Sequence, residues 1–478
     1  MFSRDLALAL PELILAGSAL GLLVIGAFSP RSYRAVGWGG VFSLLAAVAA
    51  VFLGPQGRAF SGSLVVDGVT FYSQIAVFLA CAVAIPLGQS WFARKNITNF
   101  EFPILILLAA LGMAMMVGAG DLISLYVGVE LQSLALYVLA AMYRDDAKAS
   151  EAGLKYFVLG ALSSGLLLYG ASLIYGFAGS TRFVDIAAAV QGHAGTGVLF
   201  GLVFLICGLA FKVSAAPFHM WTPDVYEGAP TPVVGFFAGA PKIAAMVLFA
   251  RVLYECFPEA TAQWRQILIL IALASIAVGA FAGLAQTNLK RLWAYSSIAN
   301  VGYAVLGLAA GNGEGVKAML IFMVLYMVDV TGFFACLSSL TRKGKAMESI
   351  EDMAGLFKES PAIALAMTAF SLSALGLPPF SGFWAKYYVF KAAIGVQDPI
   401  IQGAAIAGLV GSVVAAFYYL RLIKSMWFDA ASGSVEAPPR DAVFVAMGAA
   451  LFSFPVVLLA LHFLDPQAQA AAAAFGLK

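Results

Sequence analysis

Long apolar runs recur along the whole chain and are separated by short polar breaks. When the hydropathy pattern is divided at Pro, Gly and charged residues, it gives about fourteen segments of roughly 20 residues, the length that crosses a hydrocarbon core of about 30 Å. They lie near residues 6–28, 35–54, 70–92, 102–119, 121–142, 152–177, 196–226, 232–255, 264–286, 291–310, 315–340, 361–392, 401–426 and 441–463. The pattern therefore predicts an all-α, polytopic membrane protein with about 14 transmembrane helices.

The composition supports a membrane protein and excludes several other classes. Of the 478 residues, 62% are hydrophobic and 11% are charged, whereas soluble domains carry roughly 25% charged residues. A net charge of +2 provides no basic face for nucleic acid. Residues 1–10 lack a basic region and an obvious cleavage pattern, so we expect the first apolar run to be a membrane span and not a cleaved signal.

The loop charges predict how the spans are oriented, because cytoplasmic loops hold an excess of Lys and Arg. Loops after odd-numbered segments hold many: Arg31, Arg34, Arg94, Lys95, Arg144, Lys148, Lys290, Arg291, Arg342, Lys343, Lys345 and Lys358. Loops after even-numbered segments hold few: Arg58, Arg182 and Arg265. We therefore expect both termini to face away from the positively charged compartment.

The chain also matches itself at one offset. Gly153-Leu154-Lys155 corresponds to Gly315-Val316-Lys317, Gly170 to Gly332, and Ala216-Pro217-Phe218 to Pro378-Pro379-Phe380, always 162 residues apart. Because this offset spans five segments, an odd number, the copies would have opposite orientations, as in many ion-coupled transporters. The alternative is a chance match in a biased composition. The repeat predicts four regions: 1–100, 101–258 for spans 4–8, 259–428 for spans 9–13, and 429–478.

The seventh and twelfth segments are longer than a span requires and contain proline near the middle. Proline removes a backbone hydrogen bond and clashes with the preceding turn. Pro217 should therefore break helix 7, and Pro378 and Pro379 should break helix 12. In lipid, carbonyl groups freed in this way are tolerated only inside protein or beside water. We expect both discontinuous helices to face a hydrated interior.

Three charged residues fall deep within the predicted spans. Glu130 lies nine residues after Asp121, which at ~1.5 Å per residue is ~14 Å from the end of its helix. Lys242 and Lys212 are also far from a span end. Such charges cost at least ~2.5–3.5 kcal/mol and typically mark ion or proton paths. The alternatives are a structural carboxylate for Glu130 and a cap on freed carbonyl groups for Lys212.

Other titratable residues are candidates with a plainer alternative. Lys155 lies about one turn from a span end, where its ammonium group can reach the interface. Asp329 should be near mid-depth, but the sequence identifies no partner for it. His219 follows the break at Pro217, and either a structural hydrogen bond or a proton carrier fits its position. Lys386 follows the second break.

Two motifs resemble the antiporter-like subunits shared by respiratory complex I and multisubunit cation/proton antiporters. They are the stretch from Lys290 to Tyr303, KRLWAYSSIANVGY, and the stretch from Ala216 to Pro232, APFHMWTPDVYEGAPTP. Within this family, residues 129–139 and 154–164 are most similar to subunit N, called ND2 in mitochondria. With the span count, the resemblance covers nearly the whole chain.

The resemblance implies site residues as well as a fold. Glu130 and Lys155 match the family's paired acidic and basic positions, Lys212 and Lys242 its central lysines, and Lys386 its second-half lysine. Asp329, Lys290 and Tyr303 are secondary candidates, and no residue is expected to bind a metal. The halves are not equivalent, because the offset takes Lys212 to Ala374.

The implied function is proton translocation by a membrane-arm subunit of NADH:quinone oxidoreductase, beside homologous subunits in a bacterial inner membrane rather than a mitochondrial one. FMN, iron–sulfur clusters and quinone would belong to partner subunits. The chain agrees with this, because it has no GxGxxG motif after a strand, and its four cysteines, Cys81, Cys207, Cys256 and Cys336, lie far apart. The alternatives are a subunit of a cation/proton antiporter or membrane-bound hydrogenase, or a structural membrane spacer.

Overall fold

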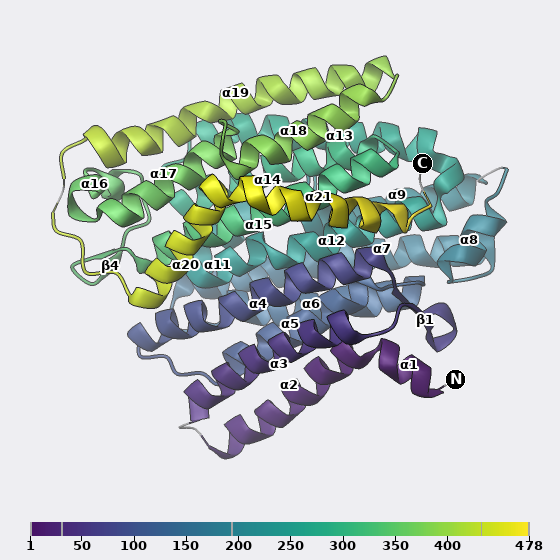
Figure 1. The fold of residues 1–478 in the computed structure, drawn as a ribbon, viewed down its shortest axis with the longest axis horizontal. Helices are drawn as coiled ribbons and strands as arrows, with labels where there is room; N and C mark the ends of the chain where they lie inside the picture. The colour runs from purple at the N-terminus through teal and green to yellow at the C-terminus, as the bar shows by residue number, and fades with distance from the viewer. Residues whose placement is uncertain (1, 30–31, 193–194, 432, 477–478) are drawn as a thin grey trace.

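The computed structural model describes residues 2–29, 32–192, 195–431 and 433–476, and these form a bundle of helices that lie side by side (Figure 1). Arg31 lies outside the described residues. The first half contains α1 (Phe2–Leu8), α2 (Leu10–Phe28), α3 (Tyr33–Leu53), α4 (Gly68–Arg94), α5 (Glu101–Val117), α6 (Leu122–Ala140), α7 (Ala147–Ala178), α8 (Phe183–Ala189), α9 (Thr196–Val213), α10 (Trp221–Gly228), α11 (Thr231–Ala238) and α12 (Ala240–Arg251).

The second half contains α13 (Thr261–Leu284), α14 (Leu289–Ala309), α15 (Gly313–Ser339), α16 (Leu356–Glu359), α17 (Pro361–Leu375), α18 (Ser381–Gly395), α19 (Pro399–Phe428), α20 (Arg440–Leu451) and α21 (Val457–Ala473). Two antiparallel hairpins lie in loops, β1 (Gly57–Ala59) with β2 (Leu64–Val66), and β3 (Thr341–Arg342) with β4 (Lys345–Ala346).

The predicted membrane spans are confirmed within the described part of the chain. Each predicted segment holds one helix or a broken pair of helices. In that part, 12 helical segments are long and apolar enough to cross a membrane, and α5 and α17 are shorter apolar helices. The all-α polytopic class predicted by hydropathy is therefore correct.

The loops gather at the two ends of the bundle, as alternating spans require. Both termini, β1 and α8 lie at one end in Figure 1, and β4 and α16 lie at the other. Single β-bridges join Leu64 to Ala119 and Asp121 to Arg182, and so connect the loops after spans 2, 4 and 6. At the far end, Lys290 pairs with Glu348. We call the far end, where the loops after odd spans meet, the lysine-rich end, and the other the opposite end.

Both predicted helix breaks are present. The helix α9 ends at Ser214, whose φ is 67°, and α17 ends at Gly376, whose φ is 93°. These left-handed caps are 162 residues apart, the offset found in the sequence. The chain becomes helical again at Trp221 and at Ser381. Discontinuous helices 7 and 12 are therefore observed at corresponding positions of the two halves.

Two further breaks were not predicted. Gly239, with φ −102° and ψ −97°, separates α11 from α12 inside the eighth span. Phe454 is non-helical, with φ −161° and ψ 130°, at the junction before α21. The next residue, Pro455, cannot donate a backbone hydrogen bond. The boundaries also differ, since α21 continues to Ala473 and the first span begins at Leu10 after a separate short helix.

Close helix contacts at glycine recur in the two halves. A Cβ atom added at Gly112 of α5 would lie 2.5 Å from the backbone nitrogen of Gln132 in α6. In the second half, a Cβ atom at Gly279 of α13 would lie 2.6 Å from the nitrogen of Ala299 in α14. Small residues allow this approach of helix backbones in membranes. The first two spans of each predicted repeat therefore pack alike.

Replacing Gly112 with valine should lower the amount of correctly assembled chain. The added side chain would force α5 away from α6, and overpacking of this kind typically costs about 1–3 kcal/mol. Immunoblotting of membranes after detergent extraction measures the outcome. Gly165→Val is the matched control, since nothing lies within 4 Å of a Cβ atom at Gly165. Equal amounts of both variants would contradict the prediction.

Candidate functional site

The break in helix 7 places Lys212 against α6. Its Nζ donates to Ser133 Oγ at 2.9 Å and to Tyr137 Oη at 3.5 Å. Glu130 lies one turn before Ser133 and interacts electrostatically with the Lys212 ammonium. Among the described residues, no ion pair within 4.0 Å joins the two, and Glu130 Oε1 is buried without a hydrogen-bond partner. Lys212 is therefore held by hydroxyl groups and is not a cap for the broken helix.

Lys242 lies in the most enclosed part of the bundle. Only 1% of its surface is exposed, and its Nζ donates to Ser297 Oγ of α14 at 2.5 Å. The same Ser297 oxygen accepts from Tyr326 Oη of α15 at 2.7 Å. The Tyr226 ring lies 5.6 Å from the ammonium nitrogen. Among the described residues, this fully buried ammonium thus has one hydroxyl group and one aromatic face as partners, and burying it without an ion pair is costly.

A small cavity of about 30 Å³ lies beyond Tyr326, which forms part of its wall. A water molecule needs about 10–15 Å³ and two to four polar partners. The polar residues around the cavity supply such partners: Ser296, Asn300, Tyr326, Asp329 and Ser373. The cavity can therefore connect the Lys242 side of the bundle to Asp329 through water.

Asp329 has partners on both parts of the broken helix 12. Its Oδ2 accepts from Ser373 Oγ of α17 at 2.5 Å and from Ser381 Oγ of α18 at 2.7 Å. Ser381 also contacts Ser453 Oγ at 2.8 Å. Asp329 Oδ1 is buried and has no partner among the described residues. This carboxylate therefore lies at the junction of α15, α17, α18 and the last span.

Lys386 caps the second helix break. Its Nζ donates to the carbonyl groups of Ala374 and Leu375 at 2.9 and 3.0 Å, and to Ser412 Oγ at 2.7 Å. The Tyr303 ring lies 4.9 Å from the same nitrogen. Lys386 thus has, at the break in helix 12, the capping role that was considered for Lys212 at the break in helix 7. Tyr303 itself donates to the carbonyl group of Gly408 at 3.3 Å.

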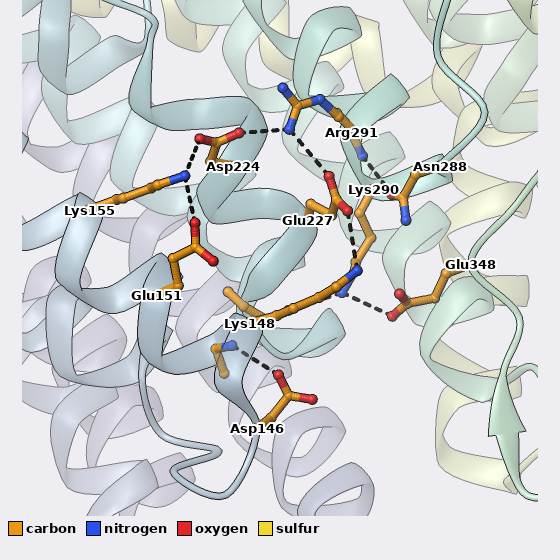
Figure 2. Close-up of polar contacts among 12 residues, drawn as sticks. Asp146, Lys148, Glu151, Lys155, Asp224, Glu227, Asn288, Lys290, Arg291 and Glu348 are labelled. Atoms are coloured by element: carbon orange, nitrogen blue, oxygen red, sulfur yellow. Dashed lines mark hydrogen bonds and ion pairs between the residues drawn. The ribbon is translucent and has the colours of Figure 1, made fainter.

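We call the interior charged residues Glu130, Lys212, Lys242, Asp329 and Lys386 the row. Lys155 lies away from it, in a charged cluster at the lysine-rich end (Figure 2). Its Nζ is 2.7 Å from both Glu151 and Asp224, and its side chain is 42% exposed. Among the described residues Lys155 therefore pairs with Glu151 and Asp224 and not with Glu130, and its part in proton transfer stays a prediction. The interface position allowed by its place near the span end describes Lys155 better.

The charged cluster joins α7, α10 and α14. Asp224 bridges Lys155 to Arg291, whose Nη1 is 2.7 Å from Asp224 and 3.2 Å from Glu227. Lys290 pairs with Glu348 at 2.9 Å and donates to the carbonyl group of Ala229. Lys290 thus connects loops at the lysine-rich end. It does not contact the central lysines among the described residues.

His219 lies between α9 and α10, partly buried. Its Nδ1 is buried and finds no partner in the described part of the chain. No described hydrogen bond or ion pair joins His219 to Lys212, Lys242 or Lys386. The structure therefore places His219 beside the break but not within the row.

The sequence indicated the charged members of the row but not their hydroxyl partners. Ser133 is three residues after Glu130, so helix periodicity alone could have placed it on the same face. Ser296, Ser297 and Asn300 all lie inside the Lys290–Tyr303 motif. Serine is frequent in membrane helices, and no spacing rule separates these from other serines.

Replacing Lys155 with glutamine should have a smaller effect than replacing Asp224 with asparagine. Lys155 is well exposed and loses two ion pairs, with Glu151 and with Asp224, and exposed pairs of this kind each contribute little to stability. Asp224 holds both Lys155 and Arg291, so its loss leaves two cations without their shared partner. The activity of isolated membranes, normalised to the assembled chain, measures both. A larger loss from Lys155→Gln would contradict this ranking.

The sequence of this chain is similar to known proteins over most or all of its length. The profile of the family described as NADH:quinone oxidoreductase/Mrp antiporter, transmembrane, matches residues 119–414. NADH-quinone oxidoreductase subunit N of Caulobacter sp. (strain K31) is 68% identical over 99% of this chain and 99% of its own length. The chain belongs to the subunit N family.

Solved structures share the fold of this subunit N family member over nearly its full length. A chain of respiratory complex I from Thermus thermophilus is 35% identical, with a TM-score of 0.82, and covers 97% of this chain and 99% of its own. A chain of an archaeal membrane-bound sulfane sulfur reductase is 26% identical, with a TM-score of 0.86, and covers 98% and 97%. Within the described residues, no group of three or more His, Cys, Asp and Glu is placed to hold a metal ion.

Proposed function

We propose that this chain is a proton-translocating membrane-arm subunit of a bacterial NADH:quinone oxidoreductase, complex I. One observation carries the proposal: partly buried Lys212 and buried Lys242 and Lys386 lie in contact with hydroxyl groups, inside a chain 68% identical to a subunit N. Charges inside a membrane protein are expensive and mark ion or proton paths. A chain that only filled space would gain nothing from three such ammonium groups.

Proton transfer along this row uses groups that can both donate and accept. Serine and tyrosine hydroxyl groups have this property, and lysine alternates between ammonium and amine. A proton taken up beside Glu130 and Lys212 would pass to Lys242, Ser297 and Tyr326, and then through water in the cavity to Asp329 or Lys386. Each ammonium is stable at depth only while a nearby charge or dipole offsets its desolvation. Changes in neighbouring charge therefore move the proton onward.

The redox chemistry belongs to other subunits in this proposal. FMN, the iron–sulfur clusters and the quinone site would be carried by partners, and this chain would lie beside other membrane-arm subunits in the inner membrane. Its part would be the proton path alone. The relative from Thermus thermophilus, a chain of complex I, supports this assembly.

The rival functions differ in what they predict for the buried charges. The 68% identity to a subunit N over the full length favours complex I over a cation/proton antiporter or a membrane-bound hydrogenase. A structural spacer needs no titratable group at Glu130. The deciding experiment is therefore a variant that preserves assembly and removes only the charge.

Glu130→Gln should leave complex I assembled and lower NADH-driven proton pumping at least about tenfold, a lower bound set beneath the roughly 10²–10⁴-fold contribution of a positioned proton-transfer group. The amide preserves size but cannot carry the proton. Acidification of inverted membrane vesicles measures pumping, and a native gel measures assembly. Glu101→Gln at the start of α5, near the lysine-rich end, is the control. Normal pumping by the assembled variant would favour the spacer.

A further inference from the structure

A second charged group lies near the opposite end and is not used by the row described above. Lys317 Nζ of α15 is 2.9 Å from Asp465 Oδ1 of α21. Tyr388 Oη of α18 donates to Asp465 Oδ2 at 2.5 Å, and its ring lies 5.7 Å from the Lys317 nitrogen. Three helices thus meet at one carboxylate. We call Lys317, Tyr388 and Asp465 the outer triad.

The outer triad lies at the boundary between the protein interior and the surface of the opposite end. Lys317 is only 10% exposed, whereas the Asp465 side chain is 33% exposed. Lys317 comes four residues after the start of α15, about 6 Å along the helix axis. Two other charges face the triad. Glu314 lies 3.9 Å from Lys317, and the positive charge of Lys391 of α18 interacts electrostatically with Asp465. Tyr387 is a further titratable neighbour.

The same three spans also meet deeper in the bundle. There, Asp329 of α15 accepts from Ser381 of α18, which contacts Ser453 in the last span. Along α15, Asp329 and Lys317 are twelve residues apart, and so are Ser453 and Asp465 in the last span. The two spans run in opposite directions. They therefore carry two polar layers at matching depths, one near the membrane centre and one near the opposite end.

One face of α18 connects these two layers. Ser381, Trp384 and Tyr388 follow the i, i+3, i+7 spacing of a single helix face. Trp384 lies between the layers, and its Nε1 is buried without a partner in the described part of the chain. A buried indole N–H normally finds a hydrogen-bond acceptor. Its position suits a water molecule between Ser381 and Tyr388.

We propose that the outer triad is the site at which protons leave the interior for the opposite face, reached from Asp329 along the Ser381–Trp384–Tyr388 face of α18. This inference rests on the proposed function. Trp384 positions water and does not itself carry the proton. Asp465 lies in the last span, so the exit depends on that helix. The last span is outside residues 119–414, which match the family profile.

The transfer step involves one proton and no other reactant. A proton arriving through water and the Tyr388 hydroxyl binds the Asp465 carboxylate, which becomes neutral and loses its attraction for the Lys317 ammonium. Release of this proton to the aqueous face restores the carboxylate and the ion pair. While the pair is closed, Lys317 repels a cation that approaches from outside. The pair thereby opposes return of the proton.

The alternative is a purely structural clamp between α15 and the last span. Two variants separate a clamp from an exit. Asp465→Asn removes the titratable group, and Tyr388→Phe removes only a hydroxyl group while keeping the ring beside Lys317. If Asp465→Asn alone impairs assembly, the double variant Lys317→Gln with Asp465→Asn replaces the ion pair by neutral groups of similar size.

The experiment measures NADH-driven proton pumping by assembled complex I in inverted vesicles. An exit predicts that Asp465→Asn and the double variant pump at least about tenfold more slowly, that Tyr388→Phe also slows pumping, and that Asp465→Glu retains it. Glu101→Gln, the control at the start of α5, should pump normally. Normal pumping by assembled Asp465→Asn or by the double variant would overturn the proposal.

Failure of the exit proposal can be told apart from failure of the proposed function. If Glu130→Gln abolishes pumping while the assembled double variant pumps normally, protons use this chain but leave elsewhere, and only the exit is wrong. If both variants pump normally, the chain is not a proton path and both proposals fail. Loss in both supports one continuous route.

Discussion

Replacing Lys212 with alanine is expected to leave complex I assembled and to lower proton pumping and quinone reduction together, by at least about tenfold. Lys212 interacts with Glu130, and it is the only ammonium that Ser133 and Tyr137 contact among the described residues. Its loss leaves the Glu130 carboxylate buried without that charge. Quinone reduction falls as well, because electron transfer in a coupled enzyme cannot outrun the blocked proton step.

The measurement is the rate of NADH-dependent acidification in inverted vesicles, normalised to assembled complex. Lys424→Ala serves as the control, since that ammonium is on α19 with 66% of its side chain exposed and pairs only with Asp429 among the described residues. Wild-type pumping by an assembled Lys212 variant would remove this residue from the proton path.

Replacing Lys242 with methionine should separate stability from function. Methionine has a similar length and no charge, and replacing buried ions by apolar groups is often neutral or stabilising. The amount and thermal stability of the complex should therefore stay the same or rise. Pumping should fall at least about tenfold, because the only ammonium that contacts Ser297 among the described residues is gone.

Two readouts on one sample test this second prediction, the denaturation temperature of the purified complex and its pumping rate. A variant that pumps normally and is as stable as the wild type would show that Lys242 is dispensable. A variant that fails to assemble would show that Lys242 holds α12 against α14, which would contradict the prediction.

The fold was predictable because its strongest signals are local. Span length follows from hydropathy, and the breaks at Pro217 and at Pro378 follow from the missing proline N–H. The break at Gly239 also has a proline nearby, Pro241 at the start of α12, but the chain is helical again after a single residue, so hydropathy shows one continuous span. The end of the last span was placed too early, because residues after 463 are less apolar but remain helical.

The candidate site was predictable only in part, for a related reason. A charge inside an apolar run is conspicuous, so Glu130, Lys212 and Lys242 could be identified without a structure. Their partners come from other helices, and serine or tyrosine in a membrane helix carries no comparable signal. Lys155 was also conspicuous as a charge, but a conspicuous charge did not show its location. Its ion pairs with Glu151 and Asp224 belong to the charged end of the bundle.

The long-range pairs could not be predicted at all. Lys317 and Asp465 are separated by most of the second half of the chain, and neither position is marked by periodicity. Their meeting depends on the bend at Phe454, which directs α21 along α15. The same bend brings Ser453 to Ser381. A feature that arises from tertiary packing of this kind appears only in the folded structure.

The central claim, that protons cross the membrane through this chain, is tested most directly by purified complex I reconstituted into liposomes, with Lys242→Met compared with wild type and with Lys424→Ala. The measured quantity is the initial rate of proton movement across the liposome membrane per assembled complex after NADH and quinone are added. The rate should be at least about tenfold below wild type for Lys242→Met and normal for Lys424→Ala. A wild-type rate from assembled Lys242→Met complex would contradict the claim.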